Sequence, residues 1–305
     1  EAANIFKRLG RVDLSLIAED GYAAIEYTKG DLDSAGAAFQ NSIDGFRLLQ
    51  NRHELSRGYY NLGRVYWFKG RFDLAQDRLL RSVEVREEIG DQIGLVQSYL
   101  ALSEIHAFMG DWQSSSETTE KALLISDQIN HKSYLLQGKI RGQLNQLSSE
   151  LELEVEDLSV LKPESSDEVE NMALWYTLLC KYSQTTNSTI SAELQAEIME
   201  FSDLLYSPPT TVLLCLLTAS VAPFVSDSEV AKNLLQKVID YPQIPPGAPL
   251  DMVLSARALL EPLDSPERES WESKAMLAVE ERSKLIERPS DRRRFLKVRM
   301  HRLDA

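Results

Sequence analysis

Apolar residues recur along the first half of the chain at the spacing of amphipathic helices. Segments 55–68 and 72–88 carry them three and four residues apart, which is helical and not strand spacing. Short turn signals separate such segments at Lys29–Asp31, Lys69–Arg71 and Met109–Asp111. The pattern therefore predicts a series of helix pairs, each joined by a tight turn.

The turns belong to an internal repeat. Gly30, Gly70 and Gly110 are spaced by 40 residues, and other positions recur in phase with them. Small residues stand seven before and five after each glycine, and a large residue stands two after it: Ala23, Gly63 and Ser103; Ala35, Ala75 and Ser115; Leu32, Phe72 and Trp112. A glycine ends the first helix in a left-handed conformation, and the small residues let the two helices cross closely.

A second set of boundaries separates one helix pair from the next. These lie near residues 50–52, 90–91 and 130–131, which gives units of about 12–51, 52–91 and 92–130. A fourth, decayed unit over 131–162 is expected because Ser133–Leu135 echoes Ser98–Leu100 at an offset of 35 residues. Since no pair can cover its own apolar face, the pairs are expected to stack into one body.

Residues 58–85 carry a set of large and small residues that matches a known repeat. Tyr59, Leu62, Gly63, Tyr66, Ala75 and Leu79 occupy its packing positions, and residues 98–126 keep Tyr99, Leu102 and Ala122. The chain therefore resembles the tetratricopeptide repeat family over roughly residues 12–130. Three positions depart from the pattern: Ser103 replaces the usual glycine, while Thr119 and Glu26 stand where aromatics are usual. The 40-residue period is similar to that of kinesin light chains and of helical arms on bacterial STAND-type ATPases and their associated kinases.

The resemblance implies an all-α, right-handed superhelix whose first helices line a concave groove that binds a protein or peptide. Carried over by register, the groove-facing positions are Asp20, Tyr27, Arg57, Tyr60, Arg64, Trp67, Gln97, Leu100, Glu104 and Phe108. Arginine together with tyrosine and tryptophan is typical of interaction hot spots. The alternative for Trp67 and the neighbouring Phe68 is packing against the next helix pair. The lysine and asparagine set that clamps chaperone tails in some relatives is absent, which disfavours that class of partner.

The second half, residues 163–305, is predicted to be helical without the repeat signature. Helices are expected at about 167–184, 191–206, 210–222, 227–239, 249–261 and 266–287, the last starting at Ser265 as cap and Pro266 in the first turn. These segments are interpreted as divergent repeats that continue the superhelix, with a separate helical domain as the alternative. The basic end, 288–302, could dock on the acidic middle of the chain, on a partner or on nucleic acid; its interleaved apolar residues favour a helix that caps the stack.

Charge and composition narrow the class of function. The formal net charge of −14 argues against a general nucleic-acid-binding protein, which needs a positive surface. Two cysteines, both in apolar helical segments, point to a reducing compartment, and we expect a cytoplasmic location. The longest apolar run, 211–222, is too short to span a membrane. Because the chain starts at Glu1 without methionine or signal segment, we expect a fragment of a longer protein.

Catalytic signatures are missing from the sequence. The four histidines, His53, His106, His131 and His301, have no metal-site spacing, and no phosphate-binding glycine loop occurs. We therefore expect no enzyme activity, no metal and no cofactor. The leading hypothesis is a partner-binding module, the regulatory or sensory arm of a larger signalling protein. The alternatives are a sensor whose superhelix changes pitch on binding a small ligand or peptide, and a scaffold that self-associates through an exposed end.

Overall fold

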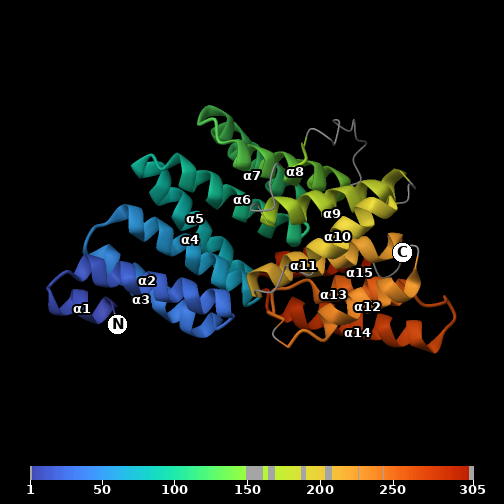
Figure 1. The fold of residues 1–305 in the computed structure, drawn as a ribbon. Coiled ribbons are helices and arrows are strands. Elements are labelled where there is room, and N and C mark those ends of the chain that lie inside the picture. Colours follow the sequence, from blue (N-terminus) through green and yellow to red (C-terminus); the bar gives the residue numbers. More distant parts are fainter. Residues whose placement is uncertain are drawn as a thin grey trace.

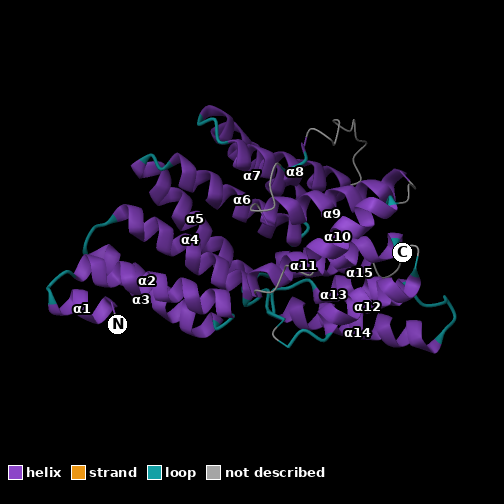
Figure 2. Ribbon diagram, in the orientation of Figure 1, coloured by secondary structure: helices purple, strands orange, loops and turns teal. Residues whose placement is uncertain are grey.

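The computed structural model describes residues 2–148, 161–163, 169–186, 190–202, 208–225, 227–242 and 244–301. All regular structure in these ranges is helical (Figures 1 and 2). The helices of the first half are α1 (Ala2–Arg8), α2 (Val12–Lys29), α3 (Leu32–Leu48), α4 (Arg52–Phe68), α5 (Phe72–Ile89), α6 (Gln92–Phe108), α7 (Trp112–Gln128) and α8 (Lys132–Ser148). The prediction of an all-α solenoid with tetratricopeptide-like units in its first half is confirmed.

Successive helices pair as α2/α3, α4/α5 and α6/α7, and each pair packs against the next. Left-handed residues end the helices at the expected places, with φ of 87°, 71° and 75° at Gly30, Gly70 and Gly110. Acidic and amide side chains cap the helices that follow: Asp31, Asn51, Asp91 and Asp111 each accept a hydrogen bond from the backbone N–H three residues later. The left-handed turns and the helix caps therefore recur with the 40-residue period.

Small residues allow each pair to cross closely. A Cβ atom on Gly63 of α4 would lie 2.9 Å from Leu79 Cγ and 3.3 Å from the Ala75 carbonyl oxygen of α5. In the next unit the equivalent contact is a hydrogen bond of 3.0 Å between the Ser103 and Ser115 hydroxyls. The crossing therefore excludes a larger side chain at these positions. The first helices form one layer, since α4 contacts α6 and α6 contacts α8.

The fourth unit keeps the 40-residue register, and the 35-residue offset suggested by sequence is wrong. Helix α8 begins 40 residues after α6. A Cβ atom on Gly138 would meet Leu123 at 2.8 Å, just as one on Gly58 would meet Ile43 at 2.8 Å. Gly138 and Leu123 each lie 80 residues, or two periods, after Gly58 and Ile43. The packing contact therefore keeps the 40-residue period, although the aromatic residues of this unit do not. The rest of the expected unit falls largely outside the described residues.

The second half contains α9 (Val169–Thr186), α10 (Ala192–Ser202), α11 (Pro208–Val221), the short 3₁₀ helix η2 (Ala222–Phe224), α12 (Ser228–Ile239), α13 (Leu250–Leu259), α14 (Pro266–Lys284) and α15 (Pro289–His301). These bounds lie close to those expected from sequence. Helix α9 packs against α8 and α11, and α11 packs against α13 and also reaches α2. The second half therefore turns back toward the first units (Figure 1).

Contacts far apart in sequence join the two halves. The backbone N–H of Gly247 donates to the Phe68 carbonyl at 2.8 Å, and a Cβ atom at position 247 would overlap the backbone of Trp67, so only glycine fits. The basic end lies along the turns of the second and third units: Arg288 pairs with Asp77 at 2.7 Å, and Arg294 pairs with Asp111 at 2.5 Å. These contacts place the basic end on the side of the stack, against carboxylates of α5 and of the turn before α7.

Candidate functional site

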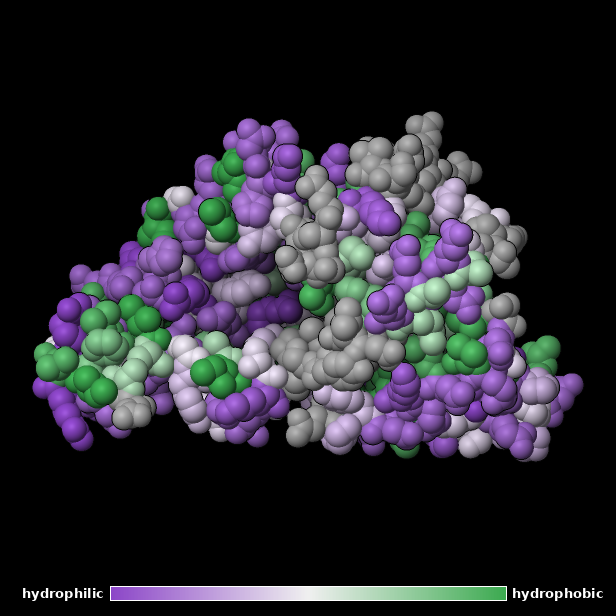
Figure 3. Space-filling view, viewed as in Figure 1, coloured by the Kyte–Doolittle hydropathy of each residue, from purple (hydrophilic) through white to green (hydrophobic). Residues whose placement is uncertain are grey.

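A polar pocket lies on the layer of first helices. Its cavity is about 180 Å³ and is lined by side chains of α4, α6, α8 and α9: Tyr60, Arg64, Gln97, Leu100, Ala101, Glu104, Tyr134, Gln137, Arg141 and Glu170. We call it the outer pocket. Five of these residues were predicted to face the groove. Figure 3 shows the molecule hollowed between its two halves, with hydrophilic residues gathered there.

Glu104 is the centre of an ion-pair network in the outer pocket. Its Oε2 atom lies 3.1 Å from Arg64 Nη1 and 3.3 Å from Arg141 Nη2, and Arg141 Nη2 also lies 2.7 Å from Glu170 Oε1. Burial raises the pKa of the Glu104 carboxyl, against the opposing effect of the two arginines. The network thus holds equal numbers of cations and carboxylates in a largely desolvated place.

Neutral polar groups surround this network. Gln97 Nε2 donates a hydrogen bond of 2.7 Å to the Tyr134 hydroxyl, which joins α6 to α8. Burial raises the pKa of Tyr27 to about 12, although nearby Arg64 lowers it. Tyr60 is half-buried and lies under Arg86, whose guanidinium carbon is 5.2 Å from the ring centroid. The outer pocket therefore offers donors and acceptors together.

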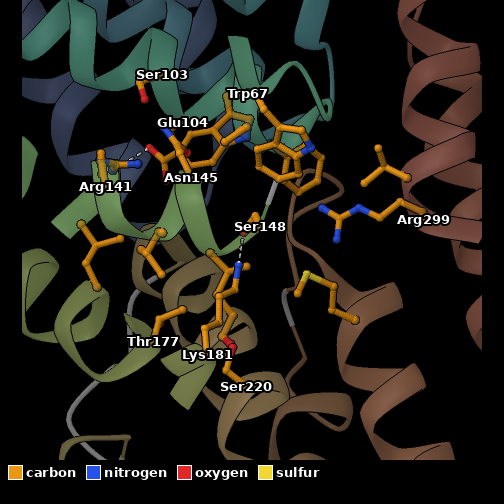
Figure 4. Close-up of a pocket in the computed structure, with 18 residues that line it drawn as sticks. Trp67, Ser103, Glu104, Arg141, Asn145, Ser148, Thr177, Lys181, Ser220 and Arg299 are labelled. Carbon is orange, nitrogen blue, oxygen red and sulfur yellow. Dashed lines mark hydrogen bonds and ion pairs between the residues drawn. The ribbon is translucent and has the colours of Figure 1, made fainter. Parts of the chain in front are cut away.

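A second cavity continues from the outer pocket and shares Glu104 and Arg141 with it. We call it the inner chamber; its volume is about 110 Å³, and both halves of the chain form its walls. The first three repeats contribute Trp67, Ser103, Ala107, Phe108 and Trp112 to its lining, and α8 contributes Leu144, Asn145 and Ser148. The second half contributes Leu174, Thr177, Lys181, Leu216, Ser220, Met252, Val298 and Arg299. Figure 4 shows these side chains converging from both halves.

Two of the predicted groove residues are covered by the second half. Trp67 is 3% exposed and Phe108 is 8% exposed. The Phe108 ring stacks on Phe295 with centroids 6.0 Å apart, and the guanidinium carbons of Arg282 and Arg299 lie 4.4 and 4.7 Å from its centroid. The repeat pattern places both residues on the layer of first helices. It carries no information on the distant segments of the second half that pack over them.

Comparison with known families identifies the repeats. The family described as tetratricopeptide repeat matches residues 13–88 and again residues 54–128. Residues 13–128 are tetratricopeptide repeats. No curated protein matches the chain. Tetratricopeptide repeats generally mediate protein–protein interactions and are typically non-catalytic modules.

The remaining predicted residues lie on the tetratricopeptide repeats outside both cavities. Arg57 pairs with Asp20 at 3.1 Å and with Glu54 at 2.7 Å, which ties α4 to α2. Asp20 is 4% exposed, and burial raises its pKa against the effect of Arg57. Tyr27 packs edge-on against Phe68 with centroids 5.4 Å apart. These groups brace the first two repeats beside the outer pocket.

Sequence reasoning missed five residues of the outer pocket: Ala101, Tyr134, Gln137, Arg141 and Glu170. A signal for Gln137 existed, because in the 40-residue register it is equivalent to Gln97, which was predicted to face the groove. The wrong offset for the fourth unit hid this equivalence. Glu170 lies on α9, beyond the tetratricopeptide repeats, and has no periodic signal.

The described residues also bear on membrane insertion and on metal binding. No helix there combines the length and apolarity that a membrane crossing requires. No group of three or more His, Cys, Asp and Glu side chains in those ranges could hold a metal ion.

Proposed function

We propose that the chain binds a protein or peptide partner in the outer pocket, on the layer formed by the first helices of its tetratricopeptide repeats. The observation that supports this is the convergence of Arg64, Glu104 and Arg141 from three successive first helices on one cavity. Residues far apart in sequence create a surface that no single repeat possesses. Such convergence is how stacked repeats build extended binding sites.

The chemistry of the outer pocket favours a polar segment of a partner chain. Its cations and carboxylates balance, and Gln97, Gln137 and two tyrosines add neutral donors and acceptors. A peptide backbone presents N–H and C=O groups together, so it can satisfy both kinds of partner. Tyrosine and arginine also give large contact areas at modest entropic cost, as hot-spot residues do.

Selection from a random peptide library displayed on phage tests this proposal. Peptides selected on the wild-type chain are measured against two pocket variants, Tyr60→Phe and Arg64→Met, with Arg81→Ala on the exposed side of α5 as the control. We expect the pocket variants to weaken binding by about 1–2 kcal/mol, roughly 5- to 30-fold, and the control to change nothing. Equal affinity for pocket variants and wild type, with all variants folded, contradicts the proposal.

We also propose that this binding surface serves as the regulatory arm of a larger signalling protein. The similarity of the 40-residue repeats to the helical arms of bacterial signalling ATPases and kinases supports this role. The complete reading frame around these residues tests it. A nucleotide-binding or kinase domain in the same frame is expected, and a frame that encodes no further domain contradicts the regulatory-arm role while leaving partner binding intact.

A further inference from the structure

The inner chamber has a chemical character different from that of the outer pocket. Half of its lining residues are apolar and they contribute most of its surface, including Leu144 of α8, Leu174 of α9, Leu216 of α11 and Met252 of α13. Its volume of about 110 Å³ approaches that of an engineered apolar cavity of about 150 Å³ that accepts benzene. The chamber therefore has room for a compact apolar group of phenyl or branched-alkyl size.

Three buried N–H groups that line the chamber have no hydrogen-bond acceptor. They are Trp67 Nε1, Arg141 Nε and Arg299 Nε, on side chains that are 3%, 6% and 6% exposed. Among the described residues, no buried oxygen that lines the chamber is left without a partner. Since an unpaired buried donor costs about 1–3 kcal/mol, these groups favour an occupant that brings acceptors.

The electrostatic balance at the inner wall points to an anion. Asp251 is the carboxylate that faces both Arg282 and Arg299, the first in a direct contact and the second at 3.6 Å. All three side chains are nearly inaccessible to solvent. Within the described residues, Arg299 and Lys181 line the chamber, and Arg282 and Asp251 lie behind Arg299, which leaves an excess of positive charge there. The nearby Arg64, Arg141, Glu104 and Glu170 balance one another, so they do not cancel the excess.

Burial of these cations is costly in this arrangement. Burial lowers the pKa of Arg299 to about 10, and it lowers the pKa of Arg282 together with the repulsion from Arg299. An ordered water molecule could accept from the unpaired donors, but it could not neutralise the excess charge. A chain with a net charge of −14 thus keeps a cationic wall inside an apolar chamber.

We propose that the inner chamber binds a small carboxylate with an apolar body. The carboxylate oxygens accept from the Trp67 indole N–H and the Arg299 guanidinium, and the body contacts the leucines and Met252. The same chemistry is found in a free aromatic or branched aliphatic acid and in the C-terminus of a peptide that ends in an apolar residue. Trp67 and Arg299 line the inner chamber and not the outer pocket, so this site does not depend on the partner-binding proposal above.

Calorimetric titration with 3-phenylpropionate and with its neutral match, 3-phenylpropanamide, tests the proposal on the full chain. We expect the acid to bind at least tenfold more tightly than the amide. Trp67→Phe removes one donor and keeps the aromatic ring, so it should weaken binding of the acid about three- to tenfold. Trp271→Phe, on α14 outside the chamber, is the matched control and should bind like wild type.

A second variant keeps the test decisive if Trp67→Phe unfolds the chain. Ala107→Leu fills the chamber and is expected to abolish binding of the acid while the chain stays folded. A peptide ending in phenylalanine, with a free or an amidated C-terminus, separates the two sources: binding of the free form indicates a peptide terminus, and its absence indicates a free acid. Equal binding of acid and amide, absence of acid binding at millimolar concentration, or undiminished acid binding by folded Ala107→Leu overturns the proposal.

Discussion

The carboxylate of Asp73 in the first turn of α5 accepts a hydrogen bond of 3.0 Å from the backbone N–H of Arg288, which lies 215 residues later in the chain. The backbone N–H of Glu287 donates to the same oxygen at 2.5 Å. Asp73 is 6% exposed, so these bonds form in a place that water hardly reaches. The connection between α14 and α15 is thereby held to the second tetratricopeptide repeat, and with it the wall that closes the inner chamber.

Removal of the Asp73 carboxylate is expected to destabilise the chain. Asp73→Ala leaves the N–H groups of Glu287 and Arg288 without an acceptor, which should lower the free energy of unfolding by about 2–4 kcal/mol. Asp77→Ala removes an exposed partner of Arg288 and should cost less than about 0.5 kcal/mol. Urea denaturation of both variants measures the difference. Equal losses would show that the Asp73 contact does not join the two halves.

Two glycines with similar backbone angles should respond differently to alanine. Gly90 and Gly110 have φ of 71° and 75°, but a Cβ atom meets nothing within 4 Å at Gly90, whereas at Gly110 it lies 3.2 Å from Val298 Cβ of α15. We expect Gly90→Ala to cost about 1 kcal/mol from backbone strain alone. Gly110→Ala should cost about 1–3 kcal/mol more, because α15 must shift.

A double-mutant cycle isolates that extra cost. In a Val298→Ala background, thermal or urea unfolding should show that most of the difference between Gly110→Ala and Gly90→Ala has disappeared. An extra cost that persists in this background would place the strain elsewhere than at the contact with α15.

His106 should make stability depend on pH. Burial lowers the pKa of its imidazole, although the Ser114 backbone and Asp111 oppose this, and the Gln76 amide nitrogen lies 3.1 Å from Nε2, where it can donate only to the neutral ring. The folded state therefore favours the neutral form, so its stabilising contribution is present above the unfolded pKa of about 6.5 and is lost as pH falls. The free energy of unfolding of wild type should exceed that of His106→Asn by more at pH 7.5 than at pH 5.

The control for this prediction is Ser273→Ala on the exposed side of α14, because neither side chain titrates between pH 5 and pH 7.5. Its difference from wild type should be the same at both pH values. A gap between wild type and His106→Asn that stays constant or widens on acidification contradicts the role given to the buried ring.

Both cysteines should be unreactive in the folded chain. Burial raises the pKa of Cys180 to about 12 and that of Cys215 to about 12, which keeps both as thiols, and neither is accessible. Ellman's reagent is expected to titrate no thiol in native buffer and two in 6 M guanidinium chloride. A Ser273→Cys variant on the exposed side of α14 should add one thiol that reacts at once. Rapid native reaction of either natural cysteine contradicts the burial of α9 or α11.

Local patterns predict most of the helices of this chain. Glycine turns and apolar spacing locate α4 and α5 within about three residues, and the Ser265 cap with Pro266 locates the start of α14. These features succeed because capping and amphipathicity act over a few residues. The same period placed Tyr60, Arg64, Gln97, Leu100 and Glu104 on one surface, and the structure gathers them in the outer pocket.

Contacts between distant segments could not be predicted in this way. The bonds from Glu287 and Arg288 to Asp73 and the cover of Phe108 by Arg282 and Arg299 join residues with no shared period. Helix α1 also lay outside the repeat that was recognised. In the fourth unit the aromatic residues suggested one register, whereas the packing of Gly138 against Leu123 follows another. The repeat period predicts which helices are neighbours in the stack. It does not predict where the second half of the chain packs on the repeats.

Fluorine NMR of the chain labelled with 5-fluorotryptophan tests most directly whether the concave side of the repeats is the binding surface. The four tryptophans include Trp67, whose ring lies 4.7 Å from the Arg64 guanidinium carbon, and Trp271 on α14. On addition of a peptide selected by the chain, the Trp67 resonance, assigned through Trp67→Phe, should shift while that of Trp271 stays in place. A shift of Trp271 with Trp67 unchanged would contradict the account.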